Sequence, residues 1–190
     1  MSRTSLATAP AACAAALAAL LASPAAAQDA PAQTAPTNSD PAMASGTAEF
    51  IDAEGASLGS AELTATPHGV LIALDMTGLP PEGWVAFHIH EGTACDPGER
   101  FETAGGHFNP NESDHGFMVE TGPHAGDMPN QWVDSDGNLR SEVFNTFVTL
   151  GDGAPGDVSG HVLMLHAEPD DYESQPAGGA GERLACAVIE

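Results

Sequence analysis

Six of the eight histidines stand at spacings that suit metal coordination. His88 and His90 are separated by one residue, within an apolar segment that reads as a strand. Because side chains at positions i and i+2 of a strand point to the same face, both rings can reach one metal ion. A single H-x-H pair is a weak signal by itself, so the other four histidines decide whether a metal site is indicated.

The next segment carries a stronger pattern. Three imidazoles and one carboxylate follow one another with seven, eight and two intervening residues: His107, His115, His124 and Asp127. This donor set suits a closed tetrahedral zinc site. His166 ends a later apolar segment. The alternative is a set of ordinary surface histidines, but histidine is too sparse to explain six clustered copies. His68 and His161, each alone beside Gly or Pro, are interpreted as ordinary.

Short β-type runs separated by turn signals must position these residues. The clearest is 69–77, where Val70, Ile72, Leu74 and Met76 alternate on one face, a period of two that indicates a half-buried strand. The Asp136-Gly137 pair predicts a hairpin. The predicted strands are 47–52, 58–66, 69–77, 84–90, 141–150, 158–166 and 184–189. Short strands at this spacing predict an all-β, antiparallel sandwich or barrel.

Two long segments, 91–131 and 167–181, are rich in Gly, Pro and polar residues and do not fit strands. Long irregular segments in a compact domain are usually functional or disordered. The first contains three of the clustered histidines, which favours function.

The first 27 residues predict a secretory signal: Arg3 precedes an Ala/Leu-rich run, and Ala25-Ala26-Ala27 fits a cleavage site. The run is too short and Ala-rich for a membrane span. Residues 28–46 contain little that can be buried and predict a disordered tether. The folded domain is therefore expected at 47–190, exported to the periplasm or secreted, without a membrane span after cleavage.

Cleavage would remove Cys13 and leave Cys95 and Cys186. In an oxidising compartment such a pair predicts a disulfide, here closing a loop of about 90 residues and worth roughly 4–5 kcal/mol. A pair of metal thiolates is the alternative, but no C-x-x-C spacing supports it.

The charge balance is strongly acidic. The chain has 27 acidic residues, four arginines and no lysine, and removing Arg3 with the signal turns the net charge from −23 to −24. We therefore do not expect nucleic acid or anionic membranes as partners.

Three segments, in order, resemble signatures of the copper/zinc superoxide dismutase family: Ala86-Phe87-His88-Ile89-His90-Glu91, Gly105-Gly106-His107-Phe108-Asn109-Pro110 and Gly178 through Cys186. The resemblance covers about 47–190. Ala86 stands where the family usually has Gly. The segment after Asp170 also lacks the lysines with which many members attract superoxide.

The resemblance implies an immunoglobulin-like Greek-key fold with two functional loops, one copper and one zinc ion per subunit, and conversion of superoxide to oxygen and hydrogen peroxide. The implied copper ligands are His88, His90, His107 and His166. The implied zinc ligands are His107, His115, His124 and Asp127, with His107 bridging both ions and taking part in proton supply. It also implies that Asp170 joins a copper histidine to a zinc histidine, that Arg183 guides and holds superoxide, and that Cys95 pairs with Cys186.

A second hypothesis is an exported module that binds or buffers copper and zinc without turnover. Retention of all seven ligands and Arg183 favours catalysis. Both a monomer and a homodimer are compatible with the sequence.

Overall fold

The computed structural model describes residues 43–190, so the predicted signal and residues 28–42 of the predicted tether lie outside the described part. The first strand, β1 (Ser45–Ile51), begins two residues before the predicted domain boundary. The reason is pairing, because Ser45 and Gly46 already lie opposite Thr64 and Leu63 of the next strand.

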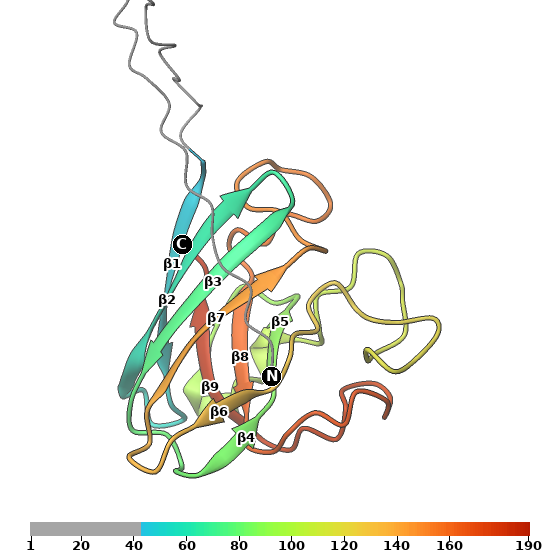
Figure 1. Ribbon diagram of the computed structural model, residues 1–190. Coiled ribbons are helices and arrows are strands. Elements are labelled where there is room, and N and C mark those ends of the chain that lie inside the picture. Colours follow the sequence, from blue (N-terminus) through green and yellow to red (C-terminus); the bar gives the residue numbers. More distant parts are fainter. Residues whose placement is uncertain (1–42) are drawn as a thin grey trace, which may run out of the picture. The chain divides into compact units, whose positions relative to one another are not determined.

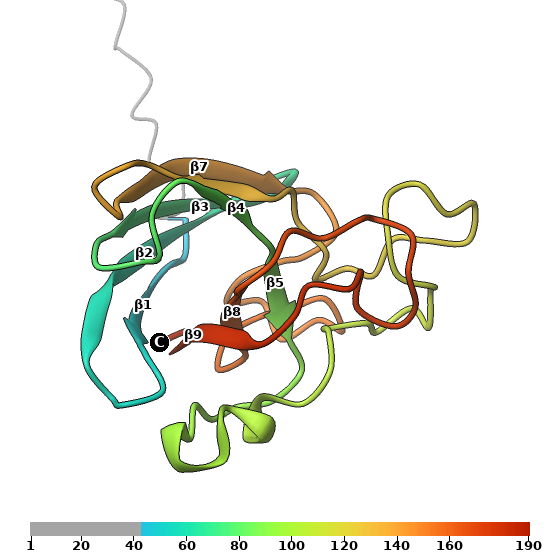
Figure 2. The same cartoon turned by 90° about the horizontal axis from the view of Figure 1, so that it is seen from below.

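The predicted all-β, antiparallel fold is confirmed (Figure 1). The remaining strands are β2 (Ser57–Thr66), β3 (Gly69–Met76), β4 (Gly83–Val85), β5 (Phe87–His90), β6 (Gln131–Val133), β7 (Leu139–Asn145), β8 (Val162–His166) and β9 (Arg183–Val188). Seven strands form one sheet in the order β5-β8-β9-β1-β2-β3-β7, and β4 pairs with β6. The sheet curls, so that β5, β8 and β9 lie opposite β3 and β7 with the interior between them (Figure 2). Within residues 43–190 the only helical turns are η1 (Pro97–Glu99) and η2 (Glu102–Ala104), and neither is long enough to cross a membrane.

The interior is filled by alternate residues of the strands. Val70, Ile72, Leu74 and Met76 are all buried, as the period of two in 69–77 predicts. They join a cluster that includes Phe50, Leu63, Phe87 and Leu165. A smaller cluster around Phe101, Val162, Met164 and Cys186 packs the loop after β5 against the other side of β8 and β9.

The single strand predicted at 84–90 is wrong in one respect, because it is two strands with different partners. β4 pairs with β6, whereas β5 pairs with β8. Ala86 lies between them, donating its N–H to Glu168 O and accepting at its carbonyl from His166 N. The predicted strand 158–166 also begins late, at Val162, because a turn at Gly160 (φ +78°) precedes it.

Candidate metal centre

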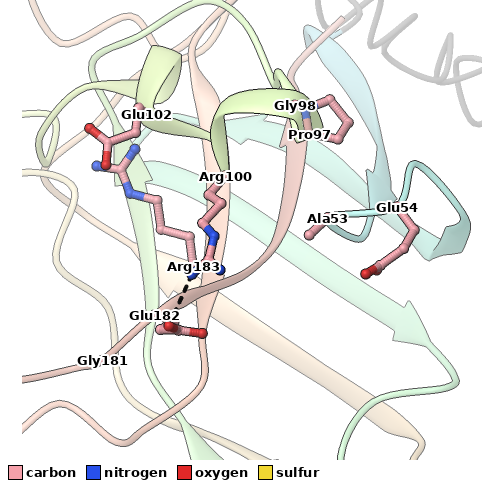
Figure 3. Close-up of a pocket in the computed structure, with 9 residues that line it drawn as sticks. All are labelled: Ala53, Glu54, Pro97, Gly98, Arg100, Glu102, Gly181, Glu182 and Arg183. Carbon is pink, nitrogen blue, oxygen red and sulfur yellow. Dashed lines mark hydrogen bonds and ion pairs between the residues drawn. The ribbon is translucent and has the colours of Figure 1, made fainter.

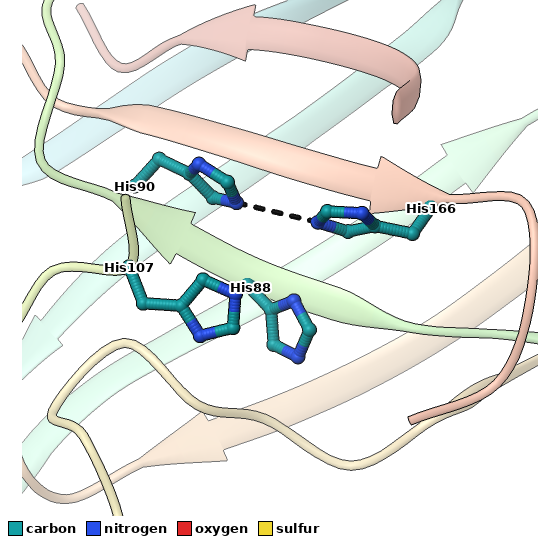
Figure 4. A group of neighbouring side chains, drawn as sticks. All are labelled: His88, His90, His107 and His166. Atoms are coloured by element: carbon teal, nitrogen blue, oxygen red, sulfur yellow. Dashed lines mark hydrogen bonds between the residues drawn. The ribbon is translucent and has the colours of Figure 1, made fainter. Parts of the chain in front are cut away.

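Four histidines from three separate parts of the chain meet beside the end of β5 (Figure 4). His88 and His90 project from β5, His166 ends β8, and His107 comes from the long loop after β5. All four are buried, and one ring nitrogen from each lies within 4.8 Å of the others. His90 Nε2 and His166 Nε2 are 3.3 Å apart. The H-x-H pair thus points to one face of its strand, as expected.

Backbone pairing brings the loop to this strand. β5 is hydrogen-bonded to β8 on one edge, and on its other edge His90 pairs with His107 and His88 with Asp127. Gly126 fits here because an added Cβ would lie 2.3 Å from the Ile89 carbonyl oxygen. The backbone of the loop is therefore paired with the strand that carries the first two histidines.

A second cluster of four groups lies next to the first and shares His107 with it. Asp127 Oδ1 lies 2.8 Å from His107 Nδ1, 3.1 Å from His115 Nδ1 and 3.3 Å from His124 Nδ1. In a tetrahedral site with zinc–nitrogen bonds of about 2.0 Å, neighbouring ligand atoms are about 3.3 Å apart. The donor set and its spacing therefore fit a zinc ion.

Unpartnered atoms indicate where a second ion fits. Among the described residues, three buried ring nitrogens have no hydrogen-bond partner: His88 Nδ1, His107 Nε2 and His166 Nδ1. An unsatisfied buried polar atom costs free energy, so its presence needs a reason. Since His88 and His107 lie ring against ring at 4.0 Å, a cation among the four histidines would satisfy both of their free nitrogens. Imidazole donors suit copper.

Asp170 connects the two clusters. Its Oδ2 accepts a hydrogen bond from His88 Nε2 at 2.8 Å, and its Oδ1 accepts one from His115 Nε2 at 3.0 Å. These bonds leave the Nδ1 atom of each ring facing its own cluster. A carboxylate in this position fixes ring orientation and tautomer. Asp170 therefore joins one histidine of each cluster, while the assignment of the two clusters to copper and zinc stays a prediction.

Three residues that the sequence reasoning missed hold this arrangement. The side chain of Gln175 hydrogen-bonds the backbone of His115 twice, accepting from its N–H at 2.9 Å and donating to its carbonyl at 2.8 Å. Asn130 does the same for Asp170, at 2.8 and 2.9 Å. Gly178 packs directly against the Asp170 carboxylate. No local pattern marks Gln175 and Asn130, because their partners lie 60 and 40 positions away in the chain, whereas Gly178 begins a segment that resembles a family signature but received no role there.

Burial lowers the pKa of the clustered histidines, whereas hydrogen bonds to carboxylates raise it. Burial lowers the pKa of His107 to about 4 and that of His166 to about 3, and it also depresses the pKa of His90. These rings are neutral at pH 7, the form that binds metals. Burial likewise opposes charge on His115, but its hydrogen bonds to Asp127 and Asp170 prevail and raise its pKa to about 9. Hydrogen bonds from three histidines overcome burial and hold the pKa of Asp127 far below its usual range.

Arg183 stands at the edge of the four-histidine cluster. Its guanidinium donates to the carbonyls of Phe101 and Gly105. The Gly105 carbonyl also lies 3.0 Å from His90 Nδ1, so one oxygen separates the arginine from a histidine of the cluster. Arg183 lines a surface pocket together with Arg100, Glu102, Glu182, Glu54 and four small residues (Figure 3). None of the histidines lines this pocket, and Arg183 is the residue that it shares with the edge of the cluster.

The predicted disulfide is present. Cys95, in the loop after β5, is bonded to Cys186 of β9. It anchors the segment that carries Phe101, whose carbonyl holds Arg183. The alternative of two metal thiolates is thereby excluded.

Comparison with known proteins agrees with this geometry. Residues 57–189 match the family described as copper/zinc superoxide dismutase. The chain is 51% identical over 145 residues to superoxide dismutase [Cu-Zn] 2 of Aquifex aeolicus, covering 75% of this chain and 84% of that protein. It is 38% identical over 151 residues to the superoxide dismutase [Cu-Zn] of Caulobacter vibrioides, covering 77% and 86%.

Solved structures show the same similarity. A SOD-like protein from Bacillus subtilis superposes with a TM-score of 0.72 at 32% identity, covering 76% of this chain and 97% of that one. The Cu/Zn superoxide dismutase from Brucella abortus superposes with a TM-score of 0.65 at 29% identity, covering 77% and 100%. With a family match over most of its length and two histidine clusters that share one ring, the chain belongs to the copper/zinc superoxide dismutase family.

Proposed function

We propose that the chain is a superoxide dismutase with one copper and one zinc ion per subunit. The proposed copper ligands are His88, His90, His107 and His166. The proposed zinc ligands are His107, His115, His124 and Asp127. The observation that carries the proposal is the orientation of His107, whose Nε2 is buried without a partner while its Nδ1 lies 2.8 Å from Asp127. A ring with one nitrogen in each cluster supports the proposal that His107 is a ligand of both ions.

The residues divide the work among them. Bound copper supplies the one-electron chemistry that oxidises one superoxide to oxygen and reduces the next to hydrogen peroxide. Arg183 presents a permanently charged, planar donor group to the small anion, beside the copper ligands. The reduction also takes up two protons: His107 Nε2, which has no hydrogen-bond partner in the protein, would hold one of them when it does not ligate copper, and water would supply the other. Asp170 keeps one ring of each cluster in the tautomer that leaves Nδ1 free for a metal.

The test is metal analysis of the purified mature protein together with a superoxide-consumption assay. We expect one copper and one zinc per chain, and a loss of consumption on chelation that both metals together restore. The His107→Ala variant should lose both copper occupancy and activity. The matched His68→Ala variant, at an exposed turn outside both clusters, should retain them. A His107→Ala protein that still binds both ions and turns over would contradict the proposal.

A non-catalytic copper-binding function is the second candidate. Three carboxylates, from Glu54, Glu102 and Glu182, line the pocket beside Arg183 and oppose the approach of an anion. A protein that binds both metals fully and still fails to consume superoxide would favour this function.

We also propose that residues 1–27 direct export and are then removed, leaving a periplasmic or secreted protein. The Cys95–Cys186 disulfide supports this, because such bonds persist in oxidising compartments. Mass spectrometry of the exported protein tests it, since the expected mature chain begins at Gln28. A chain that retains Met1 in the cytoplasm would contradict it.

A further inference from the structure

His161, which stands alone in the sequence, continues the pairing between β5 and β8. The two strands pair up to His90 and Val162, so the next pair in that register would join Glu91 and His161. The backbone N–H of His161 is turned away and donates to Val158 O at 3.1 Å. The side chain replaces it, because His161 Nδ1 donates to the Glu91 carbonyl at 2.8 Å. The imidazole thus holds the carbonyl of Glu91, the residue that follows His90.

The same ring also contacts the segment of His107. It packs against Phe108, with ring centroids 4.7 Å apart. Phe108 follows His107 directly and donates its N–H to Ile89 O at 2.8 Å. Phe108 is buried, so its position is fixed by the core beneath it as well as by His161.

One half-buried side chain therefore touches the residue after His90 and the residue after His107. These two histidines form a backbone pair of their own. Between them, Glu91 N donates to Gly106 O at 2.8 Å. His161 contacts Glu91 and Phe108 at the outer side of this paired backbone and does not contact either histidine cluster.

We propose that His161 is a positioning residue for the copper site, which sets the orientation of His90 relative to His107. Its hydrogen bond holds the carbonyl of the residue that follows one ligand, and its ring packs against the residue that follows the other. The effect is larger on copper than on zinc, because both positioned histidines are proposed copper ligands and only His107 is a zinc ligand. This inference rests on the proposed ligand set.

Two variants separate the contacts of His161. His161→Phe keeps an aromatic ring against Phe108 and removes the donor to Glu91. His161→Asn keeps a donor at the place of Nδ1 and removes most of the packing. His68→Phe is the matched control, since it makes the same change at an exposed histidine of the β2–β3 turn.

The measurements are copper and zinc affinity by chelator competition and the Cu(II) electron paramagnetic resonance spectrum. We expect His161→Phe to weaken copper binding about threefold to tenfold, the range of one lost hydrogen bond, and to alter the copper spectrum. His161→Asn should recover part of the affinity, and zinc affinity should change less than copper affinity.

Unchanged copper affinity and spectrum in both variants would overturn the inference, and so would equal losses for copper and zinc. A wild-type protein that binds no copper would refute the proposed function itself, so the two failures are distinguishable. Thermal unfolding of the metal-free variants checks that each one folds, and a lower Tm with unaltered copper binding counts against the positioning role.

Discussion

Gly178 lies against Asp170 so closely that no side chain fits between them. A Cβ at Gly178 would lie 1.8 Å from Asp170 Oδ1 and 2.7 Å from His115 Nε2, and the residue has a φ of +66°. Only glycine at position 178 therefore leaves room for the Asp170 carboxylate, which joins the two histidine clusters.

We expect Gly178→Ala to displace Asp170 and to weaken metal binding about 10- to 100-fold, the usual effect of losing a hydrogen-bond partner of a ligand. Gly179→Ala is a close control. Gly179 has a nearly identical φ of +64°, but its added Cβ meets only Asp171 Oδ2 at 3.8 Å. Both variants share the backbone strain, so equal metal affinities measured by chelator competition would contradict the role given to Gly178.

Arg183 should govern turnover rather than metal content. Replacing it with Ala removes a charged donor from the approach to copper, and we expect kcat/KM to fall about 10- to 100-fold, the range for a charge-assisted hydrogen bond. Arg183→Lys keeps the charge but loses the planar fork, so its loss should be smaller. Pulse radiolysis gives the rate and elemental analysis gives the metal content. Loss of copper in parallel with the rate would indicate a structural role instead.

Two exposed ion pairs offer a matched test of local charge. Arg100 pairs with Glu182 at 3.2 Å in the pocket beside Arg183, and Arg140 pairs with Asp75 at 3.0 Å outside that pocket. Each replacement by the neutral amide changes the net charge by one. Because field strength falls with distance, Glu182→Gln should raise kcat/KM about twofold and Arg100→Gln should lower it by a similar factor. Asp75→Asn and Arg140→Gln should leave it unchanged.

The same reasoning predicts the response to salt. With a net charge of −23 and no lysine, the wild-type protein repels an anion over long range. Added salt screens that repulsion, so the rate should stay constant or rise with ionic strength. A steep fall in rate, measured by stopped-flow, would contradict this and show that attraction near Arg183 prevails.

Zinc binding to the metal-free protein should depend on pH through His115. Burial opposes its protonation, but hydrogen bonds to Asp127 and Asp170 raise its pKa to about 9, so the ring is protonated at pH 7. Zinc must displace that proton from Nδ1, and its apparent affinity should rise with pH up to about 9. Calorimetry in buffers of different ionisation enthalpy measures the proton release. Binding without proton release at pH 7 would contradict this protonation state.

The stability of the metal-free protein should fall at both low and high pH. The raised pKa of His115 contributes stability that is complete below about 6.5 and is lost as pH rises through 9. Burial depresses the pKa of His107 to about 4 and of His166 to about 3, which destabilises the fold as pH falls from 6.5 towards those values. Thermal unfolding across pH 3–10 should therefore show a lower Tm at each end.

The features that could be predicted from the sequence are those that a local pattern of residues determines. The alternation in 69–77 places four side chains in the core, and the spacing of the clustered histidines anticipates two neighbouring groups. What it missed depends on contacts between distant residues. Ala86 divides a predicted strand because its two sides pair with different partners. Gln175 and Gly178 act on His115 and Asp170 across the fold, and His161 was interpreted as ordinary because nothing near it in the sequence indicates Glu91 or Phe108.

β5 is the edge strand of the seven-stranded sheet, and the long loop after it pairs with its outer edge at His88 and His90. The hydrogen bonds along this edge are made by Gly106, Phe108 and Gly126, which flank the proposed metal ligands His107 and Asp127. Demetallation would loosen this pairing and leave the backbone of Phe87–His90 open to an incoming strand from another molecule. The ions would then act as a safeguard against aggregation, and the metal-free protein would be the species most prone to self-assembly.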